Sequence, residues 1–289
     1  MPPRKGPARL RADLRAGSFD VFRGEAGVRI GVFDSGLGGI SVLREIAARM
    51  TAATLSYVAD SAWVPYGSRG EEVIQRRARS LARFLVADGA DIIVVACNTA
   101  TAAAVPMLRA TLPLPIVGME PAVKPATAAT RSGVVGVLAT VGTLQSARFA
   151  ALLDQFGGNI QVLTRACPGL VEQVEAGDLD GPVTRELVTR YVTPLVESGA
   201  DTLVLGCTHF PFLAPLIQAT AGPAVRIIDT GEAVARRVAQ VAAGLEPGPA
   251  APGEPAFWTS GDPATLAGPL ARLWGRPAQL AALPAEYAA

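Results

Sequence analysis

Two cysteines occupy equivalent places in an internal repeat of this 289-residue chain. Gly89-Ala90-Asp91 is followed by five apolar or small residues and then by Cys97-Asn98-Thr99. Gly199-Ala200-Asp201 is likewise followed by five such residues and then by Cys207-Thr208-His209, at a constant offset of 110 residues (207 − 97). This repeat indicates two half-chains of one architecture, each of which ends a central strand with a cysteine.

Both cysteines are predicted to follow strands of parallel sheets. Asp34 and the pair Thr140 and Thr143 also follow predicted strands, and residues 30–35 and 135–140 form a weaker second match between the halves. Ligands of parallel α/β sheets bind beyond these strand ends, and the helices that begin there favour anions at their N-termini. If the two halves face each other, the two thiols meet across one polar cleft.

Facing thiols are compatible with several chemistries. Free cysteines are often buried packing residues, but placement at two equivalent strand ends argues for a function. The three cysteines and His209 could together bind a metal ion, yet the chain has no CxxC pair, so no metal site is expected. A disulfide relay would also favour CxxC. Acid–base chemistry remains: a thiolate removes a proton from a carbon atom, and a thiol delivers one to the opposite face.

The rest of the chain alternates in a way that is typical of an α/β protein. Short β-branched runs at residues 28–33, 55–58, 92–96, 134–138, 203–206 and 225–228 alternate with longer amphipathic stretches. Such strands predict parallel sheets covered by helices on both faces. A Pro/Gly/Ala-rich loop at residues 245–256 precedes a last strand near Phe257 and a last helix at residues 266–274.

Residues 70–87 predict the clearest helix of the chain. Its apolar face is formed by Val73, Ile74, Leu81, Phe84 and Leu85. Its arginines are expected on the other faces: Arg76, Arg77, Arg79 and Arg83.

Composition limits the class of protein. Half of the residues are apolar, 18% are charged and the net charge is +1, which excludes wholesale disorder and a broad polyanion-binding surface. No apolar run reaches the roughly 18 residues of a membrane-spanning helix. Three cysteines without a disulfide framework favour a reducing, cytoplasmic setting. Lys5 and Lys124 are the only lysines and neither lies in a cofactor-binding motif, so a pyridoxal Schiff base is not expected.

The chain is predicted to comprise a basic arm and two domains. Residues 1–26 lack the apolar run of a signal peptide, and we expect them to be disordered. Crossing points rich in proline and glycine lie near Glu120-Pro121 and Asp229-Thr230-Gly231. They predict a first α/β domain from residues 27–119 and 230–289 and a second from residues 120–229. This division places one cysteine in each domain.

Five stretches of this sequence resemble the glutamate racemase family. They are Asp34-Ser35-Gly36-Leu37-Gly38-Gly39, Pro65-Tyr66-Gly67, Cys97-Asn98-Thr99-Ala100, Gly206-Cys207-Thr208-His209-Phe210-Pro211 and Phe257-Trp258-Thr259-Ser260-Gly261-Asp262. The resemblance implies two pseudosymmetric α/β domains, each a mostly parallel sheet flanked by helices, with the active site at their interface. It also implies a cofactor-independent isomerase that interconverts L- and D-glutamate and supplies D-glutamate for peptidoglycan, cell-wall biogenesis and cell shape.

The resemblance assigns roles to residues of this chain. Cys97 and Cys207 are the catalytic proton carriers, the first acting on D-glutamate and the second on L-glutamate, while Asp34 and His209 assist them. The substrate-binding residues it implies are Asp34, Ser35, Pro65, Tyr66, Gly67, Asn98, Thr99, Thr140, Thr143, Thr208 and His209. Hydroxyls, amides and helix N-termini suit the two carboxylates of the substrate, and Asp34 suits its ammonium group.

Two places depart from this pattern. Phe149 stands where the family suggests a tyrosine, and Cys167-Pro168-Gly169 replaces a bulkier sequence. We interpret Cys167 as structural. Glu175 is a weaker candidate for an auxiliary site residue, because a solvated carboxylate at a helix end would explain it equally well.

Other functions stay open at this point. An aspartate or related amino-acid racemase of the same superfamily is the first alternative. Gly36-x-Gly38, followed by Asp60, imitates a dinucleotide fingerprint, but the third glycine is absent and Asp34 would repel a pyrophosphate. Some relatives inhibit DNA gyrase, and the basic arm makes this a second activity to test; no other nucleic-acid partner and no membrane is expected. The expected partners are L- and D-glutamate and a second copy in a homodimer.

Overall fold

The computed structural model of the chain describes residues 26–246, 248–249 and 253–288. Its strands form two large sheets and one small antiparallel pair, β1 with β10. The strands of the described residues are β1 (Ala26–Gly27), β2 (Arg29–Asp34), β3 (Thr54–Ala59), β4 (Ile92–Val95), β5 (Ile116–Val117), β6 (Val134–Ala139), β7 (Gln161–Ala166), β8 (Thr202–Gly206), β9 (Arg226–Ile228), β10 (Gly248–Pro249), β11 (Ala256–Thr259) and β12 (Leu280–Ala282).

Both large sheets are parallel and share one strand order. The first sheet runs β12-β11-β3-β2-β4-β5 and the second runs β7-β6-β8-β9. In each, the first strand of the half-chain is central, the second lies on one side of it, and the third and fourth lie on the other. The α/β class with two pseudosymmetric sheets is therefore confirmed, and β4 and β8 are the equivalent strands that precede the two cysteines.

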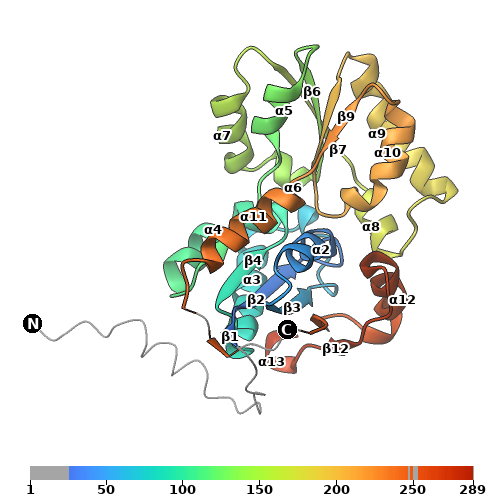
Figure 1. The fold of residues 1–289 in the computed structure, drawn as a ribbon. Helices are drawn as coiled ribbons and strands as arrows, with labels where there is room; N and C mark the ends of the chain where they lie inside the picture. Colours follow the sequence, from blue (N-terminus) through green and yellow to red (C-terminus); the bar gives the residue numbers. More distant parts are fainter. Residues whose placement is uncertain (1–25, 247, 250–252, 289) are drawn as a thin grey trace, which may run out of the picture.

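Helices cover both sheets, and Figure 1 shows the second sheet standing above the first. The helices are α2 (Ile40–Arg49), α3 (Glu71–Ala87), α4 (Asn98–Thr111), α5 (Val123–Ala129), α6 (Val141–Leu144), α7 (Ala147–Phe156), α8 (Leu170–Glu175), α9 (Pro182–Glu197), α10 (Ala214–Ala221), α11 (Gly231–Ala242), α12 (Pro263–Trp274) and α13 (Ala285–Ala288), with 3-10 turns η1 (Tyr66–Ser68) and η2 (Phe210–Leu213). Within the described residues, no helix combines the length and apolarity needed to cross a bilayer.

Helix α3 corrects one expectation. It buries the predicted apolar residues Ile74, Leu81, Phe84 and Leu85, but Arg77 is also fully buried. Buried arginines persist when a carboxylate neutralises them, and Arg77 forms an ion pair with Asp60 in which both side chains are 0% exposed.

The C-terminal part of the chain returns to the first sheet. Helix α11 lies at the junction of the two sheets in Figure 1, and β11 and β12 extend the first sheet beyond β3. Apart from Ala26 in β1, the basic arm expected over residues 1–26 lies outside the described residues.

Candidate active site

One cavity lies where the carboxyl ends of the two sheets meet. Its empty volume, counted together with space that is open to solvent, is ≈ 270 Å³. It is lined by Ser35, Pro65, Tyr66, Gly67, Cys97, Asn98, Thr99, Thr140, Thr143, Val171, Gly206, Cys207, Thr208 and His209. All of the predicted site residues are in this lining except Asp34, which lies directly behind it. Val171 and Gly206 were not predicted, and only Gly206 carried a signal, as the residue before a motif cysteine.

Cys97 lies at the N-terminus of α4, directly after the first sheet. Its sulfur accepts a hydrogen bond from the main-chain N–H of Ala100 at 3.5 Å and lies 3.9 Å from Ser35 Oγ. Burial, followed by the charge of Asp34, raises the pKa of the Cys97 thiol well above its usual range, and the Ala100 bond opposes this only partly. The thiol form is therefore the resting form of Cys97.

Asp34 is a fully buried carboxylate at the end of β2. Its Oδ2 accepts hydrogen bonds from Gly39 N–H at 2.7 Å and Thr208 Oγ1 at 3.3 Å, and Ser35 Oγ donates to its Oδ1. Burial raises the pKa of Asp34, while nearby His209 lowers it. Asp34 thus lies next to Cys97, behind the lining of the cavity. Its hydrogen bond with Thr208 connects the two halves of the site.

Cys207 has a different partner, the single histidine of the chain. The sulfur lies 3.6 Å from His209 Nδ1, and His209 Nε2 lies 2.6 Å from Glu175 Oε1. Burial lowers the pKa of His209, but the hydrogen bonds and charges of Cys207 and Glu175 outweigh it, and the pKa rises well above 6.5. His209 therefore places a cationic imidazole beside the sulfur of Cys207.

Glu175 is an internal residue of this network rather than a solvated one. Its side chain is 11% exposed, and Oε1 also accepts a hydrogen bond from Leu37 N–H at 2.6 Å. The glycines around Leu37 make this approach possible: a Cβ on Gly36 would lie 2.1 Å from Glu175 Oε1, and one on Gly38 would lie 2.3 Å from His209 Nδ1. Residues 34–39 of the first half therefore form a loop that packs closely against Glu175 and His209 of the second half.

The opposite wall is rich in hydroxyl groups. Thr99 Oγ1 lies 2.9 Å from Thr140 Oγ1 and 3.2 Å from Thr143 Oγ1, so hydroxyls from both halves converge. Thr140 also caps α6 by accepting from Thr143 N–H. The amide of Asn98 is buried with neither its nitrogen nor its oxygen hydrogen-bonded. Unsatisfied buried groups of this kind are costly unless a ligand pairs with them.

Two further expectations concern residues outside this cavity. Cys167 is 2% exposed, and its thiol lies 3.3 Å from the carbonyl oxygen of Arg165. Phe149 is buried in α7. Neither residue is in the lining of the cavity between the sheets.

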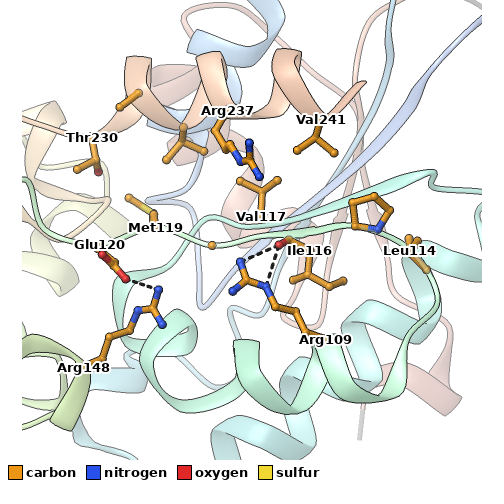
Figure 2. Close-up of a pocket in the computed structure, with 14 residues that line it drawn as sticks. Arg109, Leu114, Ile116, Val117, Met119, Glu120, Arg148, Thr230, Arg237 and Val241 are labelled. Carbon is orange, nitrogen blue, oxygen red and sulfur yellow. Dashed lines mark hydrogen bonds and ion pairs between the residues drawn. The ribbon is translucent and has the colours of Figure 1, made fainter. Parts of the chain in front are cut away.

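A second, larger cavity lies behind the junction of the halves (Figure 2). The side chains of Arg109, from α4, and Arg237, from α11, point into the same space. Arg109 donates to the carbonyl oxygen of Ile116 at 3.2 and 3.0 Å, and Arg148 forms an ion pair with Glu120. This cavity shares no lining residue with the thiol cavity, so the two are separate, and its lining includes three arginines and one glutamate.

The fold and the cavity define the class of protein: an α/β protein with two pseudosymmetric sheets, each of which places a cysteine thiol on one shared cavity. Comparison with known sequences identifies the family. A family model described as Asp/Glu/Hydantoin racemase matches residues 30–238. The glutamate racemase of Pseudomonas aeruginosa is 56% identical over 252 residues, covering 86% of this chain and 94% of that protein. That of Methylococcus capsulatus is 55% identical over 263 residues, covering 90% and 97%. The chain therefore belongs to the Asp/Glu/hydantoin racemase family, and within it to the glutamate racemases.

Solved structures agree with this assignment. A crystal structure of Escherichia coli glutamate racemase in complex with L-glutamate and activator UDP-MurNAc-ala matches with a TM-score of 0.79 and 30% identity, covering 89% of this chain and 97% of that one. The Thermus thermophilus glutamate racemase in complex with beta-chloro-D-alanine matches with a TM-score of 0.74 and 34% identity, covering 90% and 98%. Racemases are isomerases, and these relatives do not favour the aspartate racemase alternative.

Proposed function

We propose that this chain interconverts L- and D-glutamate by moving protons between the α-carbon and two thiols. The observation that carries the proposal is the placement of Cys97 and Cys207 on one cavity, after equivalent strands of two like sheets. Inversion needs one group on each face of the carbon, because a base that removes a proton cannot return it to the far face. No cofactor or metal ion has a part in this scheme.

The two thiols have different neighbours and take different first steps in this scheme. Cys207, whose sulfur lies 3.6 Å from His209 Nδ1, removes the α-proton of L-glutamate. Cys97, held as a thiol by burial and by Asp34, then delivers its own proton to the other face and gives D-glutamate. The reverse direction needs the opposite state: Cys97 first loses its proton to nearby Asp34, whose pKa is raised, and Cys207 carries the proton that it delivers, which His209 beside it can supply.

Neutral donors bind the substrate in this scheme. The described lining contains no lysine or arginine, so the carboxylates depend on the threonine hydroxyls, the Asn98 amide and main-chain N–H groups at helix N-termini. Asp34 supplies negative charge beneath the ammonium group. Its buried position means that it acts through Ser35 and Thr208 as well as by charge.

Optical rotation gives the direct test of this function. Purified protein incubated with L-glutamate, without added cofactor or metal, should bring the rotation to zero, and L-aspartate should change far more slowly. Equal rates for the two amino acids would favour a broader racemase, and unchanged rotation of both would refute the proposal. Racemisation would supply D-glutamate for peptidoglycan in the cytoplasm.

We also propose the division into domains expected from the sequence, residues 27–119 with 230–289 and residues 120–229. Sheet membership supports it, since the strands β6 to β9 bond only to one another and the strands β11 and β12 join the first sheet. Limited proteolysis should cut first near Glu120 and Thr230. Homodimer formation and gyrase inhibition stay predictions, which sedimentation and a supercoiling assay with and without residues 1–26 would test.

A second proposal concerns the arginine-lined cavity of Figure 2. The E. coli relative is described with an activator that is a nucleotide diphosphate sugar. Arg109, Arg148 and Arg237 offer the cationic donors that a diphosphate needs. We propose that an activator of this chemistry binds here. Arg237→Ala should abolish activation by UDP-MurNAc-Ala and leave the basal rate unchanged; activation that survives this change would exclude the cavity.

A further inference from the structure

A buried ion pair lies behind the cavity wall that carries Tyr66. The guanidinium of Arg77, in the middle of α3, holds Asp60 by two bonds, Nε to Oδ2 at 3.0 Å and Nη2 to Oδ1 at 2.8 Å. The phenolic hydroxyl of Tyr66 donates to the same Oδ2. Tyr66 lines the cavity, whereas Arg77 and Asp60 do not. The orientation of a cavity residue therefore depends on a charge pair one layer behind it.

The last turn of the chain completes the surroundings of this arginine. Arg77 Nη2 and Ser80 Oγ both donate to the main-chain oxygen of Tyr287, at 3.0 and 3.1 Å. The Tyr287 ring packs edge-on against Phe84 of α3, with ring centroids 5.5 Å apart. The ring of Trp63 covers the guanidinium, 5.1 Å from Cζ. Helix α13 is thus fixed to α3 at the level of Arg77.

Movement of this pair would reach the second half of the site. Gly67, next to Tyr66, approaches Thr140 so closely that a Cβ on Gly67 would lie 2.8 Å from Thr140 Cβ. Thr140 belongs to the hydroxyl cluster that joins the two halves. A guanidinium that loses an acceptor in a buried place shifts toward another one, because an unsatisfied buried donor is costly. Such a shift would move Asp60, then Tyr66, and then the wall against Thr140.

We propose that Arg77 is a positioning residue for the active site and that the C-terminal turn, residues 285–288, holds Arg77 in place. The turn at residues 285–288 then sets how tightly the cavity binds glutamate. This inference rests on the proposed racemase function. It predicts that changes at Arg77 or at the C-terminus act mainly on KM, since neither group reaches the thiols.

The test separates positioning from stability. The double variant Arg77→Met with Asp60→Asn removes both charges and leaves neither unpaired, so its Tm should stay close to that of the wild type. Its KM for both enantiomers should rise about tenfold, the effect of losing roughly one hydrogen-bonded partner. Arg77→Lys, which keeps the charge but lacks the planar fork, should raise KM by a smaller factor. Arg76→Met, at an exposed arginine of the same helix, is the matched control and should change nothing.

A truncation after Pro284 tests the role of the last turn. It should raise KM in the wild type and have a clearly smaller effect in the double variant, because the double variant has already lost the bond from Arg77 to Tyr287. Equal effects in both backgrounds, or an unchanged KM in the double variant, would overturn the proposal. If the double variant fails to fold, the proposal is overturned instead by an unchanged KM in both Arg77→Lys and the truncated protein. If the wild type binds D-glutamate in a thermal-shift assay but does not racemise it, only the proposed racemase function is refuted. The positioning role of Arg77 is then tested by comparing the Kd for D-glutamate among the same variants.

Discussion

The two thiols of the cavity occupy equivalent positions but have unlike neighbours. Cys97 lies beside a buried carboxylate, Asp34, and its pKa is raised well above the usual range. Cys207 lies beside His209, whose pKa is raised by Cys207 and Glu175 against the effect of burial. The common fold places the two sulfurs at equivalent strand ends, and the neighbours give each sulfur a different electrostatic environment. Geometry and electrostatics are thus set by different residues.

Removing either thiol is the strongest way to test this comparison. Cys97→Ala and Cys207→Ala should each lower racemisation at least about 10³-fold in both directions, because each inversion uses both groups. ¹H NMR in D₂O separates the two faces: exchange of the α-hydrogen, where it survives, should be confined to D-glutamate in Cys207→Ala and to L-glutamate in Cys97→Ala. A normal rate of racemisation in either variant would exclude the two-thiol mechanism.

Loss of the carboxylate on the Cys97 side should have the next largest effect. Asp34→Ala removes the proton acceptor of Cys97 and the charge beneath the ammonium group. We expect a loss of about 2–5 kcal/mol of transition-state binding, measured as kcat/KM, as for truncation of one partner of a buried charge pair. Near wild-type rates in this variant would show that Asp34 has no role in the reaction.

Glu175→Gln should weaken the Cys207 side more mildly, since the amide still accepts from Leu37 N–H. We expect kcat/KM to fall about tenfold, the effect of losing one charge-assisted hydrogen bond to His209. The enantiomers have equal free energy, so this fall must be the same in both directions. The asymmetry should appear in the primary isotope effect, which should grow for α-deuterated L-glutamate and not for D-glutamate. Equal growth for both would contradict the assignment of Cys207 to L-glutamate.

Stability should fall as pH rises on both sides of the cavity, because the folded pKa values of His209 and Asp34 are both raised. Because the folded pKa of His209 lies above 6.5, its contribution to stability is full below pH 6.5 and is lost as pH rises through the folded pKa. His209→Gln should therefore lower Tm most at acidic pH. The raised pKa of Asp34 means that its ionised form destabilises the fold at neutral pH. Asp34→Asn should raise Tm at pH 7 by roughly 2–4 °C, about 1 kcal/mol for a chain of this size, and by less near pH 4. Thermal unfolding followed by circular dichroism across this pH range measures both variants. A larger loss of Tm for His209→Gln at alkaline pH, or a larger gain for Asp34→Asn near pH 4 than at pH 7, would contradict the prediction.

The sequence predicted the central strands because they are buried on both faces and read as apolar runs. β2, β4, β6 and β8 all carry this signal. β7 was missed because it is an edge strand whose residues, such as Gln161 and Arg165, are partly exposed and polar. The two-residue β5 is too short to carry any pattern.

The sequence predicts site residues that belong to motifs directly after strands. It does not predict residues whose positions depend on contacts with distant parts of the chain. Neither Arg77 nor Glu175 could be placed from helical periodicity, because each is buried by a partner distant in sequence: Arg77 by Asp60, and Glu175 by His209 and Leu37. Asp34 was expected to touch the substrate, but its place behind the lining depends on how Gly39 and Thr208 fold over it.

The enclosure of the thiol cavity has a consequence for the speed of the reaction. Cys97, Cys207 and His209 are 5%, 6% and 1% exposed, so the proposed racemisation requires the halves to separate for glutamate to enter and leave. Each separation breaks bonds such as Leu37 N–H to Glu175 and Ser41 Oγ to the carbonyl of Thr208. Large motions of this kind displace solvent and slow as its viscosity rises, and they limit turnover in many enzymes. The turnover of this enzyme should therefore depend on the viscosity of the solvent as well as on the chemistry of its two thiols.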